Sequence, residues 1–201
     1  DSLEVKQNEF EAGGFSDTTT LDGKAVFALM GTDHSKDKLL GDESADGRDS
    51  LAAAYQYTMN LNSSFTGDDN LYVRLRAGNS VGNFINKEFG TYLSMGSEYS
   101  DQLRVDKIWY TFPLGESNTV WVGPKIENYY MHGTTPSIYK PVTKQFTLGG
   151  NGNAYGASTN AGAGWAYKFD NGFAVSSNFV SSKTDLLTNQ GATSWANQVG
   201  Y

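Results

Sequence analysis

Cysteine is absent from this chain of 201 residues, and histidine occurs only at His34 and His132. The absence of cysteine excludes disulfides, thiolate metal sites and a cysteine nucleophile. The two histidines lie far apart in sequence, in connections between predicted strands. A two-histidine metal site or a Ser-His-Asp triad therefore has little to build on. We predict that the chain is not an enzyme and that it uses no cofactor and no metal.

Long apolar runs are also absent. The sequence contains no stretch of about 18 apolar residues, so it predicts no transmembrane helix. It also contains no charged segment followed by an apolar one, so it predicts no signal peptide. If the protein is exported, we expect the chain to have been trimmed. Basic residues are outnumbered, with 15 Lys and Arg against 22 Asp and Glu and a net charge of −7. This balance argues against nucleic acid as a partner, because binding it usually needs a basic face.

Alternation of apolar and polar residues is what the sequence has in place of long runs. In residues 51–61 every odd position is apolar, whereas Gln56, Thr58 and Asn60 occupy even positions. The length matches the roughly 9–11 residues of a transmembrane β-strand, and the uncharged polar face suits a water-filled lumen. Similar patterns predict strands at 20–30, 70–78, 103–112, 119–126, 163–169 and 173–181, with another beginning near 198.

The connections between these strands alternate strictly between long and short. Short links follow the second, fourth and sixth strands, and the last of them is Asp170-Asn171-Gly172, a strong hairpin signal. Long links follow the first, third and fifth strands. Outer-membrane barrels have this pattern, with short turns at one edge and long loops at the other. The longest link, residues 127–162, contains Lys140 and Lys144, and we predict that it folds inward as a constriction.

Two segments follow from this interpretation. Residues 1–14 are predicted to be the end of a helical or coiled-coil linker, because Leu3 and Phe10 are one heptad apart and Gly13-Gly14 ends the run. Residues 15–201 are predicted to be the N-terminal part of a porin β-barrel, so the fold class is all-β and antiparallel. Seven strands and a fragment cannot close a channel-sized barrel, so we expect a piece of a larger protein.

Charges that point away from the apolar face are mostly basic, and Asp22 is the one acid predicted among them. Rings of Arg and Lys favour anions in a pore, and Arg74 with Arg76 is the sharpest pair. A soluble β-sandwich with one solvated face is the alternative. The predicted pore-lining residues are Lys24, Gln56, Asn60, Arg74, Arg76, Lys107, Trp109, Trp121, Lys125 and Lys168.

Aromatic residues gather near the predicted strand ends, where they would form a membrane girdle or, on the lumen side, a surface for stacking sugars. Trp109 and Trp121 fall on the predicted inner face and are the candidates for sugar contact. The full set is Trp109, Tyr110, Trp121, Trp165, Tyr167, Phe169 and Phe173.

Two loop motifs resemble ligand sites. Asp42, Ser44 and Asp46 resemble the start of a calcium loop, but Ala53 stands where an EF-hand needs glutamate, so a solvated loop is the default. The glycine-rich run 150–156 has the wrong spacing for a dinucleotide loop and opens no helix.

Three stretches together resemble one protein family. Residues 15–29, 71–79 and 107–115 resemble the barrel entry, a strand and a strand-turn motif of cyanobacterial outer-membrane porins of the carbohydrate-selective, OprB-like type. In that family an S-layer-homology domain and a coiled coil precede the barrel. The resemblance covers most of the chain, and its motifs are structural.

The resemblance implies half of a 16-stranded barrel in the cell outer membrane, in contact with lipid. It implies passive diffusion of small hydrophilic solutes, such as ions and sugars, and assembly as a homotrimer. It also implies attachment to peptidoglycan or another cell-wall polymer through an N-terminal domain. The alternatives are a protein that mainly tethers the outer membrane to the cell wall, or a soluble carbohydrate-binding module.

Overall fold

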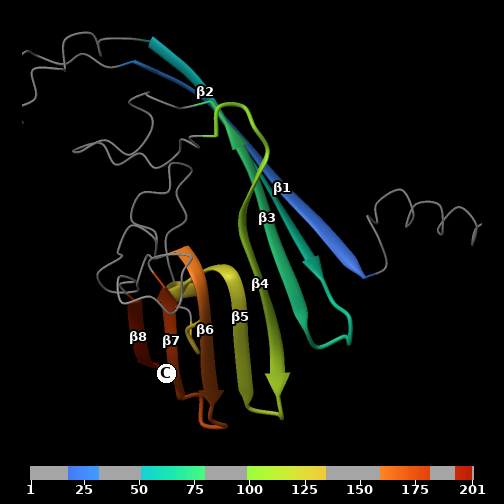
Figure 1. Cartoon of the computed structure of the whole chain (residues 1–201), viewed down its shortest axis with the longest axis vertical. Coiled ribbons are helices and arrows are strands. Elements are labelled where there is room, and N and C mark those ends of the chain that lie inside the picture. The colour runs from blue at the N-terminus through green and yellow to red at the C-terminus, as the bar shows by residue number, and fades with distance from the viewer. Residues whose placement is uncertain (1–17, 32–50, 80–98, 135–158, 182–192, 201) are drawn as a thin grey trace, which may run out of the picture.

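The computed structural model describes residues 18–31, 51–79, 99–134, 159–181 and 193–200, and within them the fold is one antiparallel sheet (Figure 1). Its spatial order is the chain order, β1 to β8, so each strand pairs with its neighbours in sequence. The all-β prediction is confirmed, whereas the predicted helical linker at 1–14 lies outside the described residues. The strands are β1 (Thr19–Gly31), β2 (Leu51–Ser63), β3 (Asn70–Gly78), β4 (Arg104–Leu114), β5 (Asn118–Glu127), β6 (Thr159–Lys168), β7 (Ala174–Ser181) and β8 (Thr193–Gly200), with a 3-10 turn η2 (Asn128–Tyr130) after β5.

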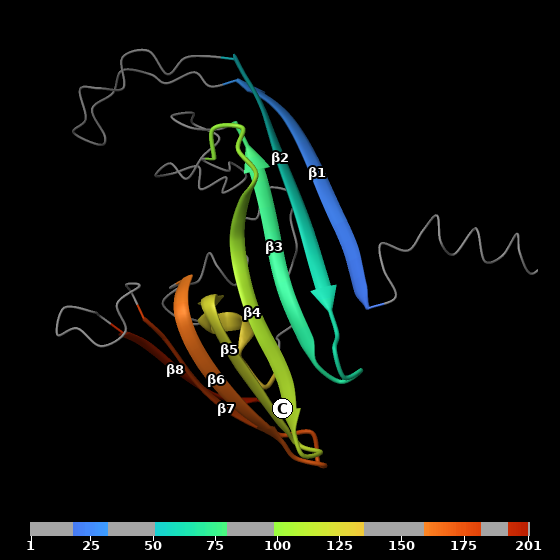
Figure 2. The ribbon, with the colours of Figure 1, turned by 45° about the vertical axis from the view of Figure 1, so that its right-hand side comes forward.

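The sheet is curved and open (Figures 1 and 2). β1 and β8 lie at its two edges, and among the described residues no register joins them. The short connections, 64–69, 115–117 and 169–173, all lie at the same end of the strands, as the alternation of short and long links predicted. In the part of the chain that the structure describes, no helix is both long and apolar enough to cross a membrane.

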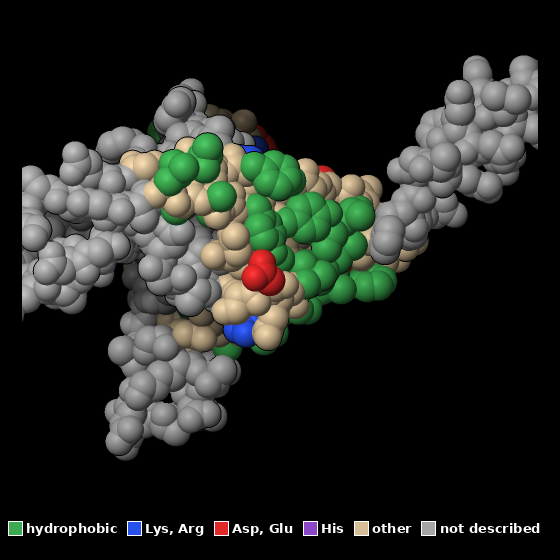
Figure 3. All heavy atoms as spheres, turned by 90° about the horizontal axis from the view of Figure 1, so that it is seen from above, with side chains coloured by type: hydrophobic (Ala, Val, Ile, Leu, Met, Phe, Trp, Pro, Cys, Tyr) green, Lys and Arg blue, Asp and Glu red, His purple; other side chains and the backbone are tan. Residues whose placement is uncertain are grey.

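One face of the sheet is apolar from β1 to β8. Because paired residues share a face, the register places Leu61, Val73 and Ile108 in one cross-strand row, and Met59, Leu75 and Val105 in the next. We call this apolar face the outer face and the opposite one the inner face. The outer face is open to its surroundings, because Phe27 is 83% exposed and Leu51 is 73% exposed. Apolar side chains gather into a broad patch in Figure 3.

The alternation breaks at two places, one in β4 and one in β5, and the β5 irregularity shifts the register with both of its neighbours. Arg74 pairs with Lys107 and Leu75 with Val105, so Asp106 is an extra residue in β4 and turns with Lys107 toward the inner face. Val105 is two residues before Lys107, so strict alternation would place both on the inner face, but Val105 is 45% exposed on the outer face. A second shift, between Gly123 and Ile126 of β5, changes the faces of the residues that follow it.

The inner face carries a small core over β4 to β7. Trp109, Ile126, Met131 and Val180 form a buried cluster. Met131 belongs to the described start of the link between β5 and β6, residues 128–134, which lies against β6, β7 and β8. Small residues in the sheet make room for it: a Cβ on Gly164 would stand 2.8 Å from both the Cβ and the Sδ of Met131.

Hydrogen bonds also fasten segment 128–134 to the sheet. The Asn128 side-chain amide donates to Asn178 Oδ1 of β7 over 2.8 Å. The Gln198 amide of β8 donates to the Thr134 carbonyl over 3.2 Å. This part of the predicted inward loop therefore does lie on the inner face, while Lys140 and Lys144 fall outside the described residues.

The turn between β2 and β3 is organised by Asp69. Its Oδ1 accepts from the Phe65 amide at 2.9 Å and the Thr66 amide at 2.7 Å, and from the Ser64 hydroxyl at 2.8 Å. Its Oδ2 accepts from the Tyr110 hydroxyl of β4 at 2.5 Å. The Tyr110 bond first, and the Thr66 and Ser64 bonds after it, hold the pKa of the Asp69 carboxyl well below its usual range.

Gly123→Ala is expected to lower the free energy of unfolding by about 1–3 kcal/mol, because an overpacked side chain forces its neighbours to move. An added Cβ would meet Trp109 Cβ at 2.5 Å and the Ile108 carbonyl oxygen at 2.7 Å. The matched control is Gly23→Ala, whose Cβ meets nothing nearer than 3.5 Å. Thermal unfolding of the two variants, followed by circular dichroism, compares them. Equal midpoints would contradict the packing at Gly123.

Asp69→Asn is expected to lower the thermal midpoint at neutral pH, because the amide replaces a carboxylate that accepts several hydrogen bonds. The depressed pKa means that the stabilisation is present above the ordinary pKa of 3.8 and is lost as pH falls through the folded-state value. The gap between the two proteins should therefore narrow in acid. Asp68→Asn, at an exposed acid in the same turn, is the control and should show no such gap.

Candidate functional site

The polar inner face is organised in two cross-strand rows. One row runs through Asp22, Asn60, Arg74 and Lys107, from β1 to β4. The next row runs through Lys24, Thr58, Arg76 and Arg104 on the same strands. Asp106, the bulge residue of β4, comes between the two rows and faces both arginines of β3.

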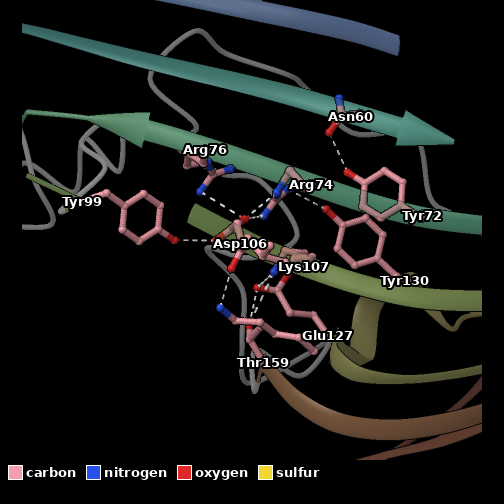
Figure 4. A network of polar contacts seen from close by, with 12 residues as sticks. Asn60, Tyr72, Arg74, Arg76, Tyr99, Asp106, Lys107, Glu127, Tyr130 and Thr159 are labelled. Carbon is pink, nitrogen blue, oxygen red and sulfur yellow. Dashed lines mark hydrogen bonds and ion pairs between the residues drawn. The ribbon is translucent and has the colours of Figure 1, made fainter. Parts of the chain in front are cut away.

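Asp106 is the centre of the contacts drawn in Figure 4. Its Oδ2 forms an ion pair with Arg74 and accepts a hydrogen bond from Arg74 Nε at 2.5 Å. Arg76 Nη1 lies 3.6 Å from the same oxygen. The other carboxylate oxygen of Asp106, Oδ1, accepts a hydrogen bond from the Tyr99 hydroxyl at 2.7 Å, which ties the connection before β4 to the sheet. Burial and this bond raise the pKa of Tyr99 to about 12.

A second acid, Glu127 at the end of β5, neutralises Lys107. The Lys107 side chain is only 2% exposed and forms an ion pair with Glu127 Oε1. The Thr159 hydroxyl of β6 donates to the same oxygen at 2.5 Å. The cluster of Arg74, Arg76 and Lys107 is thus matched by Asp106 and Glu127, which leaves an excess of one positive charge.

Aromatic rings extend this cluster across the inner face. Trp109 packs between Tyr72 and Tyr130, with ring centroids 4.2 Å and 4.7 Å away. Arg74 Nη1 donates to the Tyr130 hydroxyl at 3.2 Å, and Tyr72 donates to Asn60 Oδ1 at 2.7 Å. Trp109, which the sequence analysis names as a candidate for sugar contact, is only 6% exposed. Its indole serves the core, where Trp121 also packs.

Another group of rings lies near the end of the sheet where the short turns connect the strands. Tyr167 contacts both Trp165, at a centroid distance of 6.5 Å, and Phe169, at 4.7 Å. Tyr110 stacks on Phe112 at 5.6 Å. Trp165, Phe169 and Phe173 are exposed.

The register brings nine of the ten predicted pore-lining residues to the inner face and separates one from them. Lys125 follows the register shift in β5 and pairs with Ile108, which belongs to the outer face. Its Nζ donates to the Val105 carbonyl oxygen at 2.8 Å. Lys24 and Lys168 are exposed on the inner side, Gln56 is buried, and Asn60, Arg74, Arg76 and Trp121 are half-buried.

Alternation alone missed Asp106 and Arg104 as inner residues, because the bulge reverses the faces before Lys107. The run Arg104-Val-Asp-Lys107 does contain a signal, since its charges occupy both parities of one strand. Glu127 and Tyr99 carry no such signal, because they stand at or beyond strand ends.

Other predicted sites lie mostly beyond the described residues. His34, the calcium-loop candidates Asp42, Ser44 and Asp46, and the run 150–156 all fall outside them. His132 is buried against the inner face. Within the described ranges, no group of three His, Asp or Glu side chains is arranged to hold a metal.

Comparison with known proteins fits this two-faced sheet. The family model described as "Carbohydrate-selective porin, OprB family" matches residues 1–197. The chain belongs to this porin family. It is 28% identical over 162 residues to an uncharacterised protein of Nostoc sp. (strain PCC 7120), covering 76% of this chain and 26% of that protein. It is 30% identical over 130 residues to one of Synechocystis sp. (strain PCC 6803), covering 61% and 22%.

The porin chain therefore spans about a quarter of the length of these curated relatives. Both relatives are cyanobacterial, in agreement with the resemblance found in the sequence. The family is one of channel proteins.

Glu127→Gln is expected to destabilise the porin by about 3–5 kcal/mol, because it leaves the Lys107 ammonium buried without its counter-charge. Replacing both residues, as Lys107→Met with Glu127→Gln, should recover much of the loss, since no uncompensated charge is then buried. The control is Glu116→Gln in the exposed turn between β4 and β5. Chemical unfolding midpoints measure all three. If Glu127→Gln proved as stable as Glu116→Gln, the buried ion pair between Lys107 and Glu127 would be refuted.

Proposed function

We propose that this chain forms part of the wall of an outer-membrane channel for passive diffusion of small hydrophilic solutes, sugars above all. One observation carries the proposal: a single sheet has an apolar face open to its surroundings and an opposite face of amides, hydroxyls and charged groups. A membrane barrel needs this division, because its outside meets lipid and its inside meets water.

The strand lengths and connections support the same function. The strands of 8 to 13 residues agree with the roughly 9–11 residues of a tilted transmembrane strand. The aromatic rings near the end of the sheet where the short turns connect the strands would lie at one membrane interface. A soluble β-sandwich packs two sheets face to face, whereas the strands that the structure describes all belong to one sheet.

The mechanism involves no covalent step and no enzyme activity. Solutes would pass through water in the lumen and be sorted by size, and segment 128–134 narrows the space over β6 to β8 because it already lies on their inner face. Lipid is the partner of the outer face. A homotrimer and attachment to a cell-wall polymer stay predictions.

We also infer a modest preference for anions. Lys24, Arg104 and Lys168 are exposed on the inner side, and the ion-pair cluster around Asp106 adds one further positive charge. Basic groups along a pore lower the energy of an anion inside it. The preference should be modest, because Asp22, Asp106 and Glu127 offset half of the six positive charges on the inner side.

The full-length protein, reconstituted in planar bilayers, is expected to show discrete conductance steps and a reversal potential in a KCl gradient that favours chloride. In liposome swelling, a pentose and glucose should enter faster than a trisaccharide, because passage is limited by size. Protein-free liposomes and heat-unfolded protein serve as controls. Absence of conductance steps would overturn the channel, whereas a reversal potential favouring potassium would overturn only the anion preference.

A further inference from the structure

We propose that Asp106 is a specificity-determining residue of the pore, whose carboxylate holds the anion preference of the inner wall low enough for uncharged solutes to pass without competition from bound anions. The inference rests on the proposed channel function. It concerns a residue that strand alternation places on the wrong face and that only the β4 bulge brings into the lumen wall.

The position of Asp106 among the cations is the first argument. The two inner rows place Lys24, Arg74, Arg76, Arg104 and Lys107 on neighbouring strands, with Asp22 as the only acid in either row. Asp106 enters between the rows and contacts both arginines of β3 through one oxygen. No other carboxylate among the described residues forms an ion pair with either arginine.

Accessibility is the second argument. The side chains of Arg74, Arg76 and Asp106 keep 13%, 15% and 12% of their surface exposed, so their charges lie at the wall and not deep in a core. A charge at the wall acts on ions over about a Debye length, roughly 10 Å, and low-dielectric walls focus its field into the lumen. Neutralising Asp106 would therefore be felt by permeating ions.

The chemistry of the two arginines is the third argument. Arg74 and Arg76 are separated by one residue and project from the same face of β3. Guanidinium groups bind phosphate and carboxylate with several parallel hydrogen bonds. With Asp106 in place, Arg74 is already paired. The Tyr99 hydroxyl donates to the second carboxylate oxygen of Asp106 and keeps the carboxylate oriented toward Arg74. Without Asp106, the two guanidinium groups would form an anion site.

Asp106→Asn in the full-length protein tests the proposal in planar bilayers. The chloride-to-potassium permeability ratio is expected to rise by about twofold to threefold, as one charge within several Å of the path implies at water-like screening. Inorganic phosphate added to the variant should also reduce the chloride current, which it should not do in the unaltered protein. Asp68→Asn, in the exposed turn between β2 and β3, removes the same charge outside the ion-pair cluster and should leave the ratio unchanged.

A second variant separates selectivity from folding. Arg74→Gln combined with Asp106→Asn removes one charge of each sign and should return the permeability ratio to its original value. If Asp106→Asn fails to fold, Arg76→Gln supplies the test, because losing a cation beside an intact Asp106 should shift the ratio toward potassium. An open Asp106→Asn channel with an unchanged ratio would overturn the inference and leave the channel standing. Absence of conductance in the unaltered protein would overturn the proposed function itself.

Discussion

The ion pair between Arg74 and Asp106 depends on one extra residue in β4, and much of the inner face depends on that pair. Without the bulge, Asp106 would point outward and the two arginines of β3 would face Lys107 with no acid between them. Like charges on neighbouring strands repel, so the sheet would lose stability where its cations gather. A bulge is a small change in the backbone, but here it decides which charges meet.

The same bulge links the polar cluster to the packed part of the inner face. It leaves Lys107 and Trp109 on the inner side, where Lys107 reaches Glu127 and Trp109 packs against Tyr130. Both partners belong to the end of β5 and to η2, so segment 128–134 is held by a charge, by rings and by the glycine contacts of β6. Covering the sheet in this way needs small residues beneath the segment: Gly164 lies under Met131, and Ala166 and Ala174 lie beside Gly133.

Much of this architecture could be predicted from the sequence, and the reasons are local. A period of two and the contrast of long and short links predicted β1 to β7, and Asp170-Asn171-Gly172 predicted a tight hairpin. The errors fall where the period fails. Val105 and Lys125 changed faces at bulges, because an unpaired residue shifts every later side chain and leaves the composition of the strand unaltered. The burial of Trp109 could not be predicted either, because it depends on Tyr130, which is distant in sequence.

The wall of a porin contacts lipid on one face and water on the other, and this explains why the cations of the inner face are paired. The outer face must be apolar along every strand, so polar groups are confined to the other face and crowd there. Charges near low-dielectric walls interact strongly, which makes unpaired cations costly and also makes each acid effective. A wall of cations alone would favour anions and retain them, whereas a wall with Asp106 and Glu127 among its cations is closer to neutral. In the channel proposed above, such a surface would suit solutes that carry hydroxyl groups and no charge.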